Sequence, residues 1–248
     1  MSPDRTSAAT SKPVPAPVTS ASGRPPKPDS SAVRQVFAEL LPKSPEKRPN
    51  KRGQQTRQKL IEAAAACFSE YGYSRTRVTD IVLRAGTAQG NFYRHFSGLD
   101  EAFLAALQPA LEELSTAWAE PVTGEDEEQQ LIKHHFHYLQ LYARNRHLLR
   151  VMREAAAVSD NEGFRRLWLQ LRGAFVDSTE RWLRSRYERG GVAKVDFALL
   201  AEALGSLIEQ VCYVQIGLQP VTPRPERIQE LAAVIGQVWY RSLPPLQS

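Results

Sequence analysis

The sequence predicts an all-α protein of about nine helices, with an N-terminal three-helix helix-turn-helix domain followed by a helical bundle. From Gln54 onward, apolar residues recur at intervals of three and four, which places them on one face of a helix. No segment alternates apolar and polar residues in the manner of a strand. Glycine and proline clusters interrupt the pattern and mark the expected helix ends. We therefore expect helices over residues 54–71, 77–85, 88–95, 100–119, 126–143, 145–157, 162–188, 195–217 and 225–241.

The first 50 residues have a different composition from the rest of the chain. They hold ten of the 17 prolines, and residues 1–53 carry ten Lys and Arg against four acidic residues. A segment this poor in apolar residues cannot offset its ordering entropy, so we expect 1–50 to be a disordered basic arm. The run Gly23-Arg24-Pro25 is similar to a minor-groove AT-hook, although Ser22 stands where a flanking Arg is usual and favours a plain linker. The predicted domains are then 51–98, which holds three short helices, and 99–248, which holds the longer helices.

Composition and motifs exclude several classes of protein. The chain has two cysteines, Cys67 and Cys212, which make neither a disulfide framework nor a zinc spacing. We expect no secretory signal, no membrane span and a cytoplasmic location. No Gly-rich phosphate loop, nucleophile elbow or HExxH is present, so we expect neither an enzyme nor a cofactor. His134 and His137 share a helical face but lack a third ligand nearby, so no metal site is predicted.

The three helices between 54 and 96 have the spacing of a helix-turn-helix module. Gly72 lies where a left-handed helix cap is needed, and Gly86 lies where the turn must form. We expect Thr76 to cap the second helix and Thr87 to cap the third.

The third helix of this module is the predicted recognition helix. Its polar side chains can meet base edges or phosphates in the major groove, while Phe92 and Phe96 anchor it to the core. Gly90 lets the backbone approach the DNA closely. The residues predicted to contact DNA are Arg52, Arg77, Thr79, Thr87, Gln89, Gly90, Asn91, Tyr93, Arg94 and His95.

These residues resemble the N-terminal domain of TetR-family regulators. The resemblance rests on Thr76-Arg77-Val78-Thr79-Asp80-Ile81, Arg84-Ala85-Gly86 and Gly90-Asn91-Phe92-Tyr93-Arg94-His95-Phe96, and it covers about residues 54–105. The chain departs from the family at Ala88, where Ser or Thr is frequent, and at Leu99, where a phosphate-binding Lys is common. Basic residues at the end of the arm and just after it, Lys47, Arg48, Lys51 and Arg52, could supply the missing phosphate contact. The resemblance also implies that the helix over 100–119 connects the DNA-binding domain to a ligand-binding core.

The helical remainder predicts a ligand site and a dimer interface. Aromatic, mostly apolar helix faces with a few polar tips suit an apolar or amphipathic ligand, although a plain bundle core looks the same. The residues predicted to contact this ligand are Trp118, His135, Tyr142, Trp168 and Tyr213. The segment 197–218 is apolar around much of its circumference and, with the last helix, predicts a four-helix homodimer interface through Leu204, Ile208, Val211, Leu231, Ile235 and Val238.

Taken together, the sequence indicates a dimeric, ligand-responsive transcriptional regulator. A symmetric dimer would place two recognition helices about 34–36 Å apart, which predicts a pseudo-palindromic double-stranded DNA operator. We expect a repressor that its ligand releases from DNA, while activation stays open. The alternative from another class is a helical scaffold that kept the fold without sequence-specific DNA binding; Ala88 and Leu99 favour it.

Overall fold

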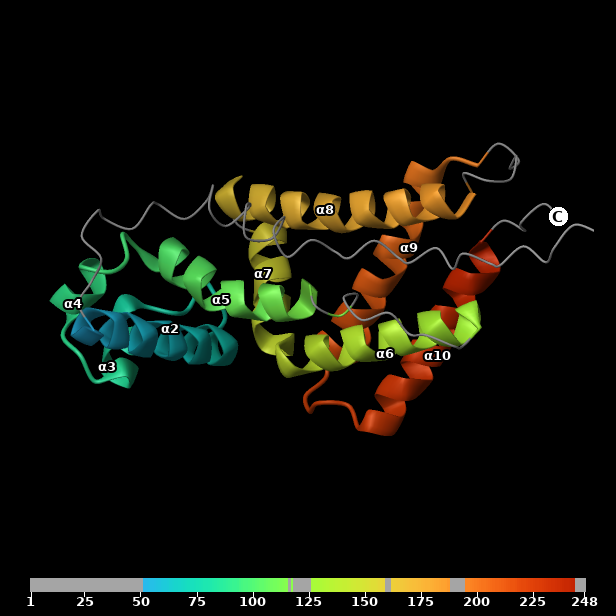
Figure 1. The fold of residues 1–248 in the computed structure, drawn as a ribbon. Coiled ribbons are helices and arrows are strands. Elements are labelled where there is room, and N and C mark those ends of the chain that lie inside the picture. The colour runs from blue at the N-terminus through green and yellow to red at the C-terminus, as the bar shows by residue number, and fades with distance from the viewer. Residues whose placement is uncertain (1–50, 116, 118–125, 159–161, 188–194, 244–248) are drawn as a thin grey trace, which may run out of the picture.

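The computed structural model describes residues 51–115, 117, 126–158, 162–187 and 195–243. The predicted all-α class is confirmed: these residues form nine α-helices and one π-helical segment, with no strand among them. In the numbering of Figure 1, the elements are α2 (Lys51–Tyr71), α3 (Val78–Ala85), α4 (Gln89–Tyr93), α5 (Leu99–Ser115), α6 (Glu127–Arg144), α7 (Arg146–Val158), α8 (Glu162–Tyr187), α9 (Phe197–Cys212), the π-helix η2 (Tyr213–Gly217) and α10 (Pro225–Ser242). The predicted arm over 1–50 lies outside the described residues.

The helices form a small N-terminal group and a larger bundle (Figure 1). Helices α2, α3 and α4 lie together at one end, and α5 extends from them toward the bundle. In the bundle, α6 packs against α10 and α8 packs against α9. Helix α7 packs against α8 and η2 and also contacts α2, so it joins the bundle to the N-terminal group.

The N-terminal group is held by an apolar core that the helical spacing predicts. Leu60, Ala64, Cys67 and Phe68 of α2 are buried, at intervals of three and four residues along one face of the helix. Phe103 of α5 packs edge-on against Phe68 with ring centroids 4.8 Å apart. This core fixes the orientation of the short helices around it.

Two glycines end helices in the left-handed conformation, which was predicted for Gly72. Gly72 has φ 77° and Gly86 has φ 64°, a region that costs other L-residues about 1 kcal/mol or more. The expected threonine caps are wrong. The hydroxyl of Thr76 donates to the carbonyl of Gly72 at 2.7 Å, and Arg77 is the residue that precedes α3. The residue before α4 is Ala88, and Thr87 accepts a side-chain hydrogen bond instead.

The bundle contains a very close helix crossing. A Cβ atom added at Gly236 of α10 would lie 2.6 Å from Cγ1 and 2.8 Å from Cα of Ile132 on α6. The absence of a side chain therefore lets the two helix backbones touch. Trp239, one turn further along α10, is buried and packs edge-on against His135 of α6.

Helix α9 together with η2 is the most apolar element described. Phe197–Gly217 is long and apolar enough to cross a membrane by length and composition, with a mean hydropathy of 1.4 in its most apolar window. One such helix is weak evidence for a span, because core helices pass the same test. Only 28% of that window is buried within the protomer, and Leu199 is the large apolar side chain of this segment that is exposed, at 65%.

Candidate nucleic-acid interface

The short helix α4 divides into a buried face and an exposed face. Phe92 is 0% exposed and Phe96, just beyond the helix, is also buried, so both anchor α4 to the core as predicted. Tyr93 is 55% exposed, and Gln89 and Arg94 are exposed as well. An aromatic side chain left outside a well-formed core, beside polar and cationic groups, is typical of a binding surface.

The segment before α4 adds an ordered polar pair to this surface. The side-chain amide of Asn91 donates to the hydroxyl of Thr87 at 2.8 Å. This bond holds the amide in one orientation, leaving its carbonyl oxygen as an acceptor. Gly90 is exposed, and a Cβ atom built there meets nothing within 4 Å.

The start of α3 presents two further predicted residues to solvent. Arg77 and Thr79 are both exposed. The carboxylate of Asp80 accepts a hydrogen bond from the backbone N–H of Arg77 at 2.9 Å and so secures the first turn. Arg52, in the first turn of α2, is exposed as well.

His95 and Arg57 meet beside the end of α4. His95 is half-buried, and its pKa is lowered by burial and by the neighbouring Arg57 and Arg94. The guanidinium of Arg57 lies 5.2 Å from the centroid of the Phe96 ring. The prediction from sequence missed Arg57 because a helix contact between α2 and α4 does not follow from spacing along the chain. Its position adds a cation to the same surface.

The predicted ligand residues have different surroundings within the part of the chain that the structure describes. His135 is fully buried against Trp239, with its Nδ1 atom 2.6 Å from the carbonyl oxygen of Leu131. Burial lowers the pKa of His135 to about 4, so the imidazole is neutral at pH 7. Trp118 lies outside the described residues.

The other three predicted ligand residues, Tyr142, Trp168 and Tyr213, come from α6, α8 and η2. The Arg153 guanidinium lies 4.0 Å from the ring centroid of Tyr213, and the Arg172 guanidinium lies 5.8 Å from that of Trp168. Tyr142 is buried, which raises its pKa above the usual range for a phenol. Tyr213 and Trp168 therefore contact charged guanidinium groups, not only apolar side chains.

A polar network joins these arginines to α9. Arg172 donates to Glu209 at 3.1 Å, to Glu202 at 2.6 Å and to the hydroxyl of Ser206 at 2.7 Å. Arg153 donates to Gln210 at 2.8 Å and lies 3.6 Å from Glu209. The network joins α7, α8 and α9 where the sequence suggested only apolar faces.

Most of the predicted dimer-interface residues lie inside the protomer. Leu204, Ile208, Leu231 and Ile235 are buried in the chain's own core, and Val211 is half-buried. Val238 is 42% exposed. Leu199 on α9 is 65% exposed and Val234 on α10 is 60% exposed. The apolar surface open to a partner on these helices is thus largely a different set of residues.

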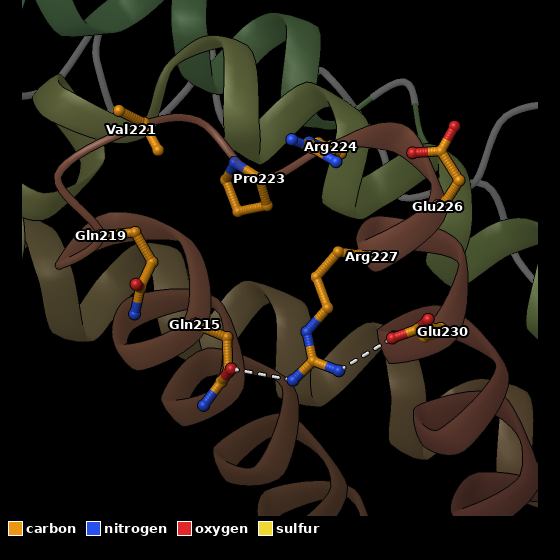
Figure 2. Close-up of a pocket in the computed structure, with 8 residues that line it drawn as sticks. All are labelled: Gln215, Gln219, Val221, Pro223, Arg224, Glu226, Arg227 and Glu230. Atoms are coloured by element: carbon orange, nitrogen blue, oxygen red, sulfur yellow. Dashed lines mark hydrogen bonds and ion pairs between the residues drawn. The ribbon is translucent and has the colours of Figure 1, made fainter.

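A surface hollow of about 550 Å³ lies at the turn between η2 and α10 (Figure 2). Arg227 points across it, donating to Glu230 at 2.9 Å and to Gln215 at 3.2 Å. None of the predicted ligand residues lines it; its lining is Gln215, Gln219, Val221, Pro223, Arg224, Glu226, Arg227 and Glu230. Among the described residues, no group of three His, Cys, Asp or Glu could hold a metal ion.

Comparison with known proteins finds a family match for the N-terminal helices. Residues 60–106 match the family model described as bacterial regulatory proteins, tetR family. The HTH-type transcriptional regulator TtgR of Pseudomonas putida is 31% identical over 121 residues, 46% of this chain and 57% of that protein. The probable acrEF/envCD operon repressor of Escherichia coli is 39% identical over 70 residues, 27% of this chain and 32% of that protein. The chain thus spans 57% of the first relative's length and 32% of the second's.

Solved structures share the fold over most of the chain. A putative TetR-family transcriptional regulator from Syntrophomonas wolfei has a TM-score of 0.62 at 17% identity, covering 78% of this chain and 99% of that one. The fatty acid degradation regulator FadR from Bacillus halodurans has a TM-score of 0.60 at 17% identity, covering 80% and 98%. At this identity the likeness establishes the arrangement of helices.

Proposed function

We propose that this chain is a DNA-binding transcriptional regulator of the TetR family that represses from a pseudo-palindromic operator and is released by a small ligand. The match of residues 60–106 to the tetR family model supports this proposal. The observation that carries the proposal is the division of α4 into a buried and an exposed face. Phe92 fixes the helix, and Tyr93 and Arg94 project from it into solvent. This arrangement suits a recognition helix in the major groove, with Arg94 reaching phosphate or guanine.

Phosphate contacts would come from several elements around α4. Arg77 and Thr79 at the start of α3, Arg52 of α2 and Arg57 beside Phe96 supply donors and positive charge. Leu99 cannot supply the charge that a lysine would give at that position, so these residues carry the electrostatic part of the affinity. Affinity that depends on such contacts falls steeply with salt.

The ligand response would pass through α5 and α7. Helix α5 begins in the N-terminal group and its residues 102–107 are all buried, while α7 contacts both α2 and η2. A ligand that binds one arrangement of these helices better than another shifts the protein toward that arrangement. A changed separation of the two recognition helices would then release DNA.

Dimerisation would use the uncovered face of α9 and α10. Leu199, Val234 and Val238 leave apolar surface in contact with water within one protomer. Covering that surface with a second copy is favourable, by about 25 cal/mol per Å² of apolar area. The buried residues Leu204 and Ile235 would support this face from beneath.

The test is selection of binding sites from random duplex DNA, followed by affinity measurements at several salt concentrations. We expect a symmetric consensus, and we expect Tyr93→Ala to weaken binding to it while changing stability by less than about 0.5 kcal/mol. Arg166→Gln is the matched control, because Arg166 lies exposed on α8, away from α4. Phe92→Ala should instead destabilise the domain by about 3–5 kcal/mol. Recovery of no symmetric site at low salt would favour the scaffold alternative.

A further inference from the structure

One face of α7 carries buried polar atoms that have no hydrogen-bond partner. These atoms are Nδ1 of His147, Nε of Arg150 and Nη1 of Arg153. The three residues follow one another at intervals of three, so they occupy a single side of the helix. Buried polar groups in native proteins are almost always paired, and each exception calls for an explanation.

The same face has weakly compensated positive charge. Nε of Arg150 lies 3.6 Å from Glu154, and Nε of Arg153 lies 3.6 Å from Glu209, both longer than a good charged hydrogen bond. Glu209 is engaged more closely by Arg172, at 3.1 Å. The acids near Arg150 and Arg153 are thus either distant or shared.

The surroundings of His147 indicate the same excess of positive charge. Its pKa is lowered by burial and further by the charges of Arg146 and Arg150. Arg146 itself is buried and donates to the backbone carbonyls of Gln219 and Pro220, where it meets partial rather than full negative charge.

Aromatic groups close the site on the side of η2 and α6. Arg153 stacks on the ring of Tyr213, so one face of its guanidinium is covered. Its Nη2 atom donates to Gln210, which leaves Nη1 as the nitrogen without a hydrogen-bond acceptor. A Cβ atom added at Gly217 would lie 3.3 Å from the hydroxyl of Tyr142 and 3.7 Å from Cβ of Arg150, so these groups are close neighbours. The side chains of Arg150 and Arg153 are 27% and 28% exposed, which gives a ligand access from solvent.

We propose that the regulatory ligand carries an anionic head group of the carboxylate class, and that Arg150 and Arg153 of α7 bind it. The inference rests on the proposed function, in which the bundle receives a small ligand. A carboxylate offers acceptors that fit the fork of a guanidinium, and it neutralises the excess charge. Because α7 also packs against α2, a head group bound here acts directly on the helix that joins the bundle to the DNA-binding domain.

The experiment compares three probes that share one tail and differ in the head group. Decanoate, decanol and decylamine are titrated into the full-length protein at pH 7.5 by calorimetry, below the concentrations at which they form micelles. We expect decanoate to bind about 10- to 100-fold more tightly than decanol, the range that charge-assisted hydrogen bonds supply. Decylamine should bind no better than decanol.

Variants then assign the preference to α7. The double variant Arg150→Gln/Arg153→Gln should reduce decanoate affinity to that of decanol and leave decanol unchanged. Arg166→Gln on α8 is the matched control and should alter neither. Arg153→Lys keeps the charge but loses the planar fork, so it should retain part of the preference. This single variant also provides the readout if the double variant unfolds below the working temperature.

Several results would overturn the inference: equal affinities for decanoate and decanol, tighter binding of decylamine, no binding of any probe, or an undiminished preference in the arginine variants. The calorimetry contains no DNA, so its outcome is independent of the operator selection. A protein that selects a symmetric operator but shows no head-group preference keeps its proposed function and loses this inference. A protein that prefers decanoate but selects no operator keeps the head-group preference and loses its proposed function.

Discussion

Gly236 offers a sharp test of the packing that positions α10. A Cβ atom at this position would lie 2.6 Å from Cγ1 of Ile132 and 2.8 Å from its Cα and backbone nitrogen. Carbon atoms in contact lie about 3.5–4.0 Å apart, so the overlap is about 1 Å. Two of the three atoms belong to the backbone of α6, which cannot turn aside as a side chain can.

The expected effect of Gly236→Ala combines two opposing contributions. Replacing a helical glycine by alanine stabilises the helix by about 1 kcal/mol. Forcing a methyl group into a packed contact destabilises by about 1–3 kcal/mol. Gly173 in α8 is the matched control, because a Cβ atom there meets nothing within 4 Å. Since both substitutions gain the same helix propensity, the difference between them isolates the packing cost.

The assay is urea unfolding of the two alanine variants and the wild type, followed by circular dichroism. We expect Gly173→Ala to be slightly more stable than the wild type, and Gly236→Ala to be less stable than Gly173→Ala by about 1–3 kcal/mol. For a chain of this size, each kcal/mol corresponds to about 2–4 °C in the melting temperature. Equal stability of the two variants would refute the close crossing of α6 and α10.

Three further predictions concern other parts of the molecule. His135 has a pKa of about 4 in the fold against 6.5 for an ordinary histidine, because the folded state disfavours its charged form. The free energy of unfolding should therefore fall by up to about 3 kcal/mol as the pH drops from about 6.5 to about 4, and should level off below that. His135→Gln should reduce this pH dependence in unfolding titrations. Val238→Glu should leave the protomer folded, since Val238 is exposed, but should yield monomers in sedimentation velocity; an unchanged dimer would place the interface elsewhere. Arg146→Gln removes charged donors from the carbonyls of Gln219 and Pro220 and should cost about 1–3 kcal/mol of stability, whereas the exposed control Arg144→Gln should cost less than about 1 kcal/mol.

The sequence by itself determined the helices and the helix-turn-helix module. Within the described residues, predicted and observed helix ends agree within a few residues, because the signals for them are local: apolar spacing, glycine and proline. The predicted end of the helix over 100–119 lies outside the described residues. The left-handed conformations of Gly72 and Gly86 follow from the same local chemistry. Phe92 and Phe96 could be assigned to the core for the same reason, because on a short amphipathic helix only one face can be buried. Side-chain caps were less predictable, since Thr76 found an alternative acceptor one turn back.

Only the tertiary structure decided which partner each apolar or charged face meets. Hydropathy marks Leu204 and Val234 alike as apolar, but packing within the protomer buries Leu204 against its own core and leaves Val234 in solvent. The sequence likewise could not place Arg153 over Tyr213, because the two residues are 60 positions apart and their contact depends on how α7 crosses η2. Helical periodicity shows that one face of a helix is apolar and will be buried, but it does not show which element packs against that face. That choice depends on the arrangement of all the helices at once, which is why the polar network on α7 and α9 emerged only from the fold.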